Sequence, residues 1–264
     1  MTMSDFRQAD VDEAAAIMAM VDAEGGAPLP QLTDTDLCVF SDAFATLLDK
    51  DVWTAWLALP DPERVRRAEL ARGFLVERRL LRLVEDGSTP EVAIQPKLGY
   101  ILAARQRPSF VAVCSVPGTA QPSAPHLFGL SDESRSEQCM LAEQVTPRTV
   151  PVLGRIREYG LFLPRRAGTF VAGWAAGTLR LPGNGNESVV VDLYDHPPQA
   201  RAQAQAQNQD DPPAVERMTI RHSPADGTLR VEHIRPGGGY AQRGRLDEAA
   251  LADQLALLFS RTTS

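Results

Sequence analysis

The stretch MTIRHSPADGTLRV, from Met218 to Val231, decides the fold class of this chain. Two β-rich runs flank Asp226-Gly227, and such a pair between β-rich runs is typical of a tight hairpin turn. With the turn centred there, Ile220 pairs with His233 across the hairpin. Apolar side chains then gather on one face, namely Met218, Ile220, Leu229 and Val231. The other face carries Arg221, Arg230 and Glu232. This alternation predicts an antiparallel sheet with one covered face.

Upstream of this hairpin, further patterns alternate between strands and helices. Short β-rich runs predict strands over residues 110–116, 126–130, 140–145, 169–181 and 188–194. Helices are expected over 33–59, 91–104 and 146–160. Asp61-Pro62-Glu63 is a strong helix start, because a capping acid and a proline suit the first turn.

The last segment, Leu246 to Phe259, predicts an amphipathic helix. Its apolar stripe consists of Leu251, Leu255, Leu258 and Phe259. Hairpins imply an antiparallel sheet, and amphipathic helices must bury their apolar stripes on it. The expected class is therefore α+β, with a central antiparallel sheet, flanking helices and this C-terminal amphipathic helix.

The chain of 264 residues is long enough for one large domain or two small ones. Residues 1–30 are acidic and alanine-rich and end in GGAPLP, which predicts a flexible N-terminal extension. Residues 31–264 are expected to form a single α+β domain. Within it, residues 197–213 carry a glutamine-alanine repeat between proline pairs, so we expect a low-complexity loop there.

Composition limits the possible partners and the compartment. The net charge of −7 argues against nucleic acid, because phosphate binding needs a basic surplus. Cys38, Cys114 and Cys139 form no CxxC pair and are expected to be packed, reduced thiols. We see no signal peptide in residues 1–22 and no apolar run long enough to span a bilayer. A cytoplasmic location without membrane insertion is the expectation.

No motif for catalysis, cofactor binding or metal binding stands out. The chain has no Gly-x-Ser-x-Gly elbow, no P-loop and no Gly-x-Gly-x-x-Gly run. His222 and His233 share a face of the last hairpin, and with Asp192 or Asp195 they would be the candidate metal ligands. Their spacing matches no metal motif, so no metal, cofactor or catalytic residue is predicted. An enzyme without a recognisable motif stays as the alternative.

The candidate partner-binding residues are Phe170 and Trp174. Both fall in a glycine- and alanine-rich run that is interpreted as a strand, with room beside the two rings for an apolar segment. In the alternative interpretation, Trp174 packs in the core and the small residues accommodate a crossing helix.

Four segments resemble the EspG family, the cytosolic chaperones of actinobacterial type VII (ESX) secretion. They are Ala68–Leu75 (AELARGFL), Leu98–Pro108 before the 110–116 strand, Ala225–Leu229, and Leu246–Phe259. The resemblance implies an α+β fold and binding of a PE–PPE helical hairpin by its exposed apolar tip. The chain is therefore expected to be a protein-binding chaperone or adaptor that holds an apolar helical substrate before export. An acidic immunity-type or regulatory adaptor is the alternative among binding proteins.

Overall fold

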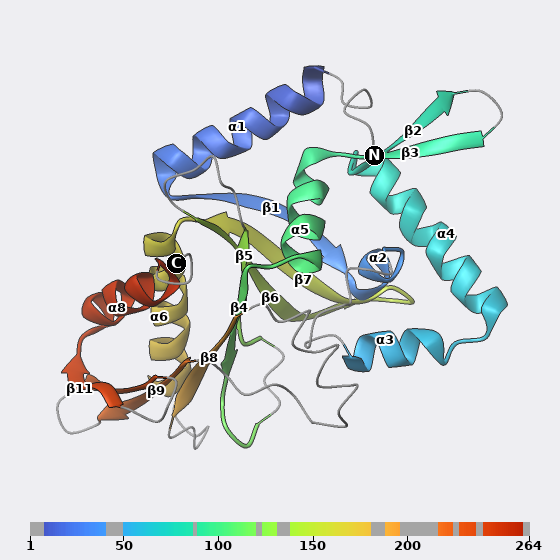
Figure 1. Ribbon diagram of the computed structural model, residues 1–264. Helices are drawn as coiled ribbons and strands as arrows, with labels where there is room; N and C mark the ends of the chain where they lie inside the picture. The colour runs from blue at the N-terminus through green and yellow to red at the C-terminus, as the bar shows by residue number, and fades with distance from the viewer. Residues whose placement is uncertain are drawn as a thin grey trace.

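The protein is described by a computed structural model over residues 8–40, 50–86, 89–119, 123–130, 138–180, 188–195, 216–223, 227–235 and 240–260. Nine strands form one sheet in the order β1-β7-β6-β5-β4-β8-β9-β10-β11, and β2 and β3 form a separate hairpin. Every strand pair is antiparallel. The predicted α+β class is confirmed (Figure 1).

The strands of the large sheet are β1 (Gly26–Thr33), β4 (Phe110–Ser115), β5 (His126–Leu130), β6 (Cys139–Val150), β7 (Gly154–Phe162), β8 (Val189–Asp195), β9 (Glu216–Ser223), β10 (Thr228–Ile234) and β11 (Tyr240–Leu246). The separate hairpin consists of β2 (Leu81–Asp86) and β3 (Thr89–Ile94). The helices are α1 (Gln8–Glu24), α2 (Asp34–Cys38), α3 (Lys50–Leu57), α4 (Asp61–Glu77), α5 (Pro96–Gln106), α6 (Pro164–Arg180) and α8 (Glu248–Ser260).

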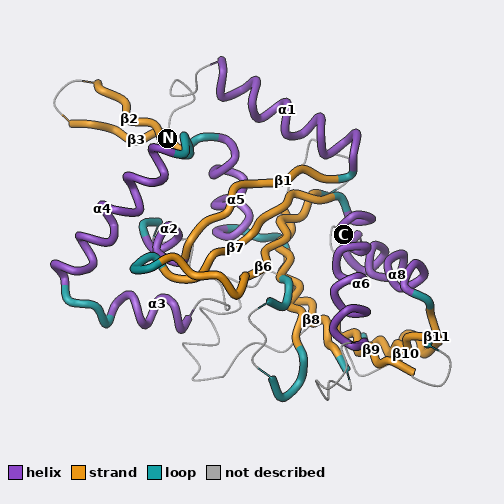
Figure 2. Tube along the Cα trace, turned by 180° about the vertical axis from the view of Figure 1, so that it is seen from behind, coloured by secondary structure: helices purple, strands orange, loops and turns teal. Residues whose placement is uncertain are grey.

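Helices cover the large sheet on both faces, and each face has its own apolar core. On one face α6 and α8 pack over β4, β8, β9 and β10. On the other face α1, α2 and α5 cover β1, β7 and parts of β4 to β6. Strand β4 serves both cores, because Phe110 and Ala112 point to the first and Val111 to the second. Figure 2 shows the sheet between these two helical layers.

The predicted C-terminal amphipathic helix is α8. Its stripe of Leu251, Leu255, Leu258 and Phe259 is fully buried in the first core. The ring of Phe259 stacks on Phe110 of β4 at 6.5 Å between centroids. The helical spacing of the apolar residues in the sequence therefore predicted correctly which face of this helix packs on the sheet.

The prediction of a flexible extension over residues 1–30 is wrong for residues 8–30. Helix α1 buries Ile17 and Val21, and β1 pairs with β7 as an edge strand of the large sheet. In β1, Ala27 and Leu29 are buried, whereas Pro28 between them is exposed. An edge strand tolerates proline because one side of it needs no ladder hydrogen bonds. The GGAPLP run therefore contains a strand.

The last hairpin has the predicted faces but a different register. Ile220 pairs with Val231, not with His233, and the paired ends Ser223 and Thr228 are separated by four residues. A shift of two residues keeps each side chain on its face, because the side-chain period of a strand is two. Met218, Ile220, Leu229 and Val231 are accordingly all buried.

Two predicted elements have the opposite secondary structure, and a third is wrong in part, since residues 91–94 of the predicted 91–104 helix belong to β3 and α5 begins at Pro96. Residues 146–160, predicted as a helix, belong to β6 and β7 and the tight turn between them. Residues 169–181, predicted as a strand, lie in α6 as far as Arg180. The buried side chains of α6 recur with helical spacing: Ala167, Val171, Ala172, Ala175, Ala176 and Leu179.

The predicted strands over 110–116, 126–130, 140–145 and 188–194 correspond to β4, β5, β6 and β8. Helix α4 begins at Asp61, as the proline signal predicted. The predicted low-complexity loop over 197–213 lies outside the described residues. None of the helices described here is long and apolar enough to cross a membrane.

Candidate functional site

The structure places both predicted partner-binding residues on a helix. Phe170 and Trp174 are one turn apart on α6, half-buried, and packed against the first core. The ring of Phe170 lies 5.6 Å from that of Phe162 on β7. Nearby, α8 crosses α6 at Gly168, where a Cβ would come within 2.3 Å of the Ala252 carbonyl oxygen. The small residues of α6 thus accommodate a crossing helix, and the contact of Phe170 and Trp174 with a partner stays a prediction.

The proposed histidine ligands are not brought together. In the observed register His222 faces Leu229, and His233 faces Met218 four residue pairs away. The Nε2 atom of His233 contacts Oε2 of Glu216 at 2.6 Å. The carboxylate of Asp192 receives two hydrogen bonds from Arg217. Within the described residues, no group of three or more histidine, cysteine, aspartate or glutamate side chains could hold a metal ion.

A buried ionic cluster lies beneath α2 and α5 on the second face of the sheet. Its centre is Glu143 of β6, which is fully buried and pairs with Arg105 of α5 and with Arg157 of β7. Arg157 Nη1 donates to Glu143 Oε1 at 2.5 Å. The same guanidinium donates to Asp34 Oδ1 of α2 at 2.8 Å, and Arg155 binds the other Asp34 oxygen at 3.1 Å. A chain of alternating charges therefore runs from the core to the surface.

The cluster shifts the titration of its members away from neutral pH. Burial alone would raise the pKa of Glu143, but Arg105 and Arg157 lower it to about 2. Burial lowers the pKa of His126, which pairs with Glu143 across the strands, to about 4. Burial also raises the pKa of Tyr159, on the other side of Glu143. Because Glu143 stays ionised and the other two stay neutral at pH 7, these groups suit a fixed charge network better than proton transfer.

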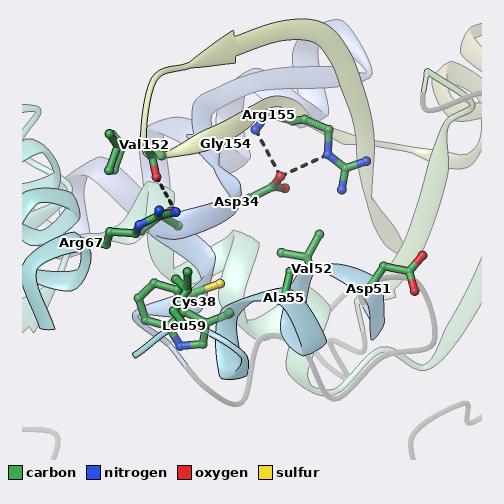
Figure 3. A pocket seen from close by; sticks show the side chains of 13 residues that line it. Asp34, Cys38, Asp51, Val52, Ala55, Leu59, Arg67, Val152, Gly154 and Arg155 are labelled. Carbon is green, nitrogen blue, oxygen red and sulfur yellow. Dashed lines mark hydrogen bonds and ion pairs between the residues drawn. The ribbon is translucent and has the colours of Figure 1, made fainter. Parts of the chain in front are cut away.

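A pocket of about 470 Å³ opens where the ionic cluster reaches the surface. It lies between α2, α3, the start of α4 and the β6–β7 turn (Figure 3). Its lining residues are Asp34, Thr35, Cys38, Asp51, Val52, Ala55, Trp56, Leu59, Arg67, Val152, Leu153, Gly154 and Arg155. Figure 3 shows Asp34 and Arg155 on one side, with Val52, Ala55 and Leu59 on the opposite side.

The β6–β7 turn at the pocket is unusually strained. Val152 has a φ of 72°, a left-handed conformation that a β-branched residue rarely adopts. Contacts to the turn hold it in place: Thr35 N donates to Leu153 O at 3.0 Å, and Arg67 Nη1 donates to Val152 O at 3.3 Å. Strain of this kind is found most often at functional sites.

Cys38, which lines the pocket, is not an activated thiol. Cys38 is buried, and burial followed by the nearby Asp34 raises its pKa to about 12. A cysteine nucleophile reacts as the thiolate, which requires a lowered pKa. The pocket therefore has the character of a binding site rather than of a cysteine-dependent active site.

A second surface feature is the projecting unit formed by α4 and the β2–β3 hairpin. Both extend away from the large sheet, on the side opposite α6 and α8 (Figure 1). Among the described residues, ten large apolar side chains are exposed, and six of them lie between residues 57 and 92. Leu57 lies on α3, and the other five, which lie on the projecting unit, are Val65, Leu70, Phe74, Leu83 and Val92.

Comparisons with protein-family models, curated proteins and solved structures found no match to this chain. The candidate sites therefore rest on the chain's own geometry. Sequence reasoning missed Asp34, Glu143 and Arg157. One signal was present for Glu143: it interrupts the apolar run CMLAEQV of a predicted strand, and a charge inside a buried strand requires a partner.

Proposed function

We propose that this protein is a cytoplasmic protein-binding chaperone or adaptor that holds an apolar helical substrate before export. The observation that carries the proposal is the concentration of exposed apolar side chains on the projecting unit. Exposed apolar side chains that gather on one part of a protein mark an interaction site, and we treat those on α4 and the hairpin as one surface. The resemblance to the EspG family supports the same kind of partner, a PE–PPE-like helical hairpin with an apolar tip.

The β2–β3 hairpin has an apolar face that is exposed and that we propose as the docking surface. Leu83 and Val92 are directly paired across the two strands and are 59% and 48% exposed. At the base of the same face, Leu81 is buried in the second core, which anchors the hairpin. Arg82, on the opposite face, pairs with Asp10 of α1 at 2.9 Å. The hairpin is thus fixed at one end and leaves Leu83 and Val92 to a partner.

The charge of the projecting unit indicates the partner's character. Residues 61–82 contain seven arginines and four acids, a local net charge of +3, whereas Glu85, Asp86 and Glu91 in the rest of the hairpin bring the whole unit, residues 61–94, to a net charge of zero. Arg72 and Arg79 are exposed, and neither has an ion-pair partner among the described residues. An amphipathic helix with an apolar stripe, and with acidic side chains placed beside Arg72 and Arg79, would complement this surface.

The first test is affinity purification of the tagged protein from its native host, with mass spectrometry of the co-purifying proteins. We expect a small, helical, secreted protein in near-equal amount. The identified protein is then co-expressed with the wild type and with the double variant Leu83→Arg and Val92→Arg. Charges on the apolar pair should abolish co-purification, because an unpaired charge would have to be buried in the complex.

Leu257→Arg is the matched control, because Leu257 is an equally exposed leucine on α8 (57%). This variant should retain the partner. If the double variant still binds with unchanged affinity, the projecting unit is not the docking surface. If no helical protein co-purifies at all, the chaperone proposal fails.

A further inference from the structure

We propose that the pocket beside Asp34 and Arg155 binds a small organic acid, a carboxylate attached to an apolar aliphatic or aromatic body. This proposal is independent of the chaperone function, since it concerns α2, α3 and the β6–β7 turn and not the β2–β3 hairpin. The pocket volume of about 470 Å³ falls within the range of small-molecule sites, roughly 300–1,000 Å³.

One wall of the pocket is apolar. Helix α3 and the residues after it contribute Val52, Ala55, Trp56 and Leu59. Trp56 and Val52 are half-buried and pack on the second core, so the wall is fixed by the fold. Such a surface favours a hydrocarbon or aromatic body over a fully polar ligand.

The opposite wall provides a cation. Arg155 uses its Nε to bind Asp34, and within the described part of the chain its outer guanidinium nitrogens have no further partner. Its side chain is 40% exposed and lines the pocket. The charge of Asp34 is already shared with Arg157, which binds the other carboxylate oxygen. Arg155 therefore retains positive charge and donors for a ligand.

The geometry selects a carboxylate. Two outer nitrogens of one guanidinium match the two oxygens of a carboxylate in a bidentate pair. The second arginine of the lining, Arg67, is engaged by Glu63 at 2.6 Å and by the Val152 carbonyl oxygen. The remaining acid, Asp51, lines the pocket from the start of α3. Arg155 can neutralise one negative charge of a ligand, and the carboxylate of Asp51 would repel a second one. The lining therefore favours a monoanion over a dianion.

The test uses 4-phenylbutyrate as the probe and the full chain, with binding followed by calorimetry and by tryptophan fluorescence. The probe should bind the wild type at least ten-fold more tightly than 4-phenylbutan-1-ol or 4-phenylbutylamine, because a charge-assisted pair contributes this much discrimination. Acetate, which lacks the apolar body, should bind far more weakly.

Two variants locate the site. Arg155→Gln should lower the affinity for 4-phenylbutyrate by about ten-fold or more. The variant should then bind the acid no more tightly than the alcohol. Ala55→Trp, which fills the apolar side without changing a charge, should abolish binding of both. Arg148→Gln is the control: Arg148 lies on the same hairpin, pairs with Glu158 and does not line the pocket.

Circular dichroism confirms that each variant is folded, and Arg148→Gln should retain full affinity. Equal affinity of the wild type for the acid and the alcohol, no binding of the acid, or unchanged binding by Ala55→Trp would each overturn the proposal.

Discussion

Glu143 and Arg105 form an ion pair in which neither side chain has any exposed surface. Arg157 is the second cation on the same carboxylate, and it is 2% exposed. Breaking a buried pair by removing one partner is strongly destabilising, because the remaining charge cannot be solvated. Glu143 thus holds two arginines inside the fold.

We expect Glu143→Gln to lower the free energy of unfolding by about 3–5 kcal/mol. Urea denaturation followed by circular dichroism measures this change. Glu158→Gln is the control on the adjacent strand: Glu158 is 45% exposed and pairs with Arg148, so its loss should change stability by less than about 1 kcal/mol. Equal effects of the two substitutions would mean that the buried cluster contributes little to stability.

The same cluster predicts a pH dependence through His126. Burial lowers its pKa from 6.5 to about 4, and the groups that act on its charge are Glu143, Arg157 and Arg105. Between pH 6.5 and 4 the unfolded chain binds a proton at this position that the folded chain does not bind. Stability from neutral His126 is therefore complete above pH 6.5 and is lost as the pH falls toward 4, by about 3 kcal/mol in total.

His126→Gln removes this titration, so the loss of stability between pH 7.5 and pH 5 should be smaller than in the wild type. Phe128→Leu is the control, because Phe128 is buried on the same face of β5 and carries no titratable group. It should lower stability equally at both pH values. An unchanged pH dependence in His126→Gln would show that His126 is not the group responsible.

The crossing of α6 and α8 predicts that glycine-to-alanine substitutions at two positions of α6 change the stability of the protein in opposite directions. At Gly168 a Cβ would lie 2.3 Å from Ala252 O and 2.9 Å from Ala256 N, both backbone atoms of α8. Gly168→Ala should therefore separate the two helices and destabilise the fold by about 1–3 kcal/mol. At Gly173 on the same helix the nearest atom is Glu248 Oε1 at 3.7 Å.

Gly173→Ala should accordingly stabilise the protein by about 0.5–1 kcal/mol, because alanine restricts the unfolded chain and favours the helix. Thermal denaturation of the two variants and of the wild type measures both changes in stability. Two shifts in the same direction would contradict the close crossing at Gly168.

Local patterns in the sequence predicted correctly which faces of the last hairpin and of helix α8 are buried. They were less successful at predicting which residues contact each other. Met218 and Ile220 are on the predicted face although the register differs by two residues, since that error does not alter the alternation. The helix α6 was predicted as a strand because Phe170 and Trp174 favour strands, whereas its alanines recur with helical spacing.

The ionic cluster depends on contacts that no local pattern encodes. Asp34 and Arg157 are 123 positions apart in the sequence, and Arg105 and Glu143 are 38 apart. Each of these residues, considered alone, looks like an ordinary surface charge of a helix or strand. Only the placement of α2 and α5 over β6 and β7 brings the charges together. The pocket, which begins at Asp34, could not be predicted for the same reason.

The strained turn at the pocket allows a last prediction. Val152 has a φ of 72°, and a non-glycine residue held in such a region stores about 1–3 kcal/mol. Glycine adopts this conformation without strain, although it raises the conformational entropy of the unfolded chain. Val152→Gly should therefore raise the free energy of unfolding by about 1 kcal/mol, a change that urea denaturation resolves.

Val150→Gly supplies the contrast, because Val150 ends β6, pairs with Gly154 and is not among the described residues with a left-handed φ. Glycine there gains nothing from relief of strain and should destabilise the protein by about 1 kcal/mol, since it weakens a strand. If Val152→Gly is destabilising to the same degree, the left-handed valine is not strained in solution. If it is stabilising as expected, the chain keeps a strained valine in the pocket lining at the expense of stability, as we expect of a side chain that contacts a ligand.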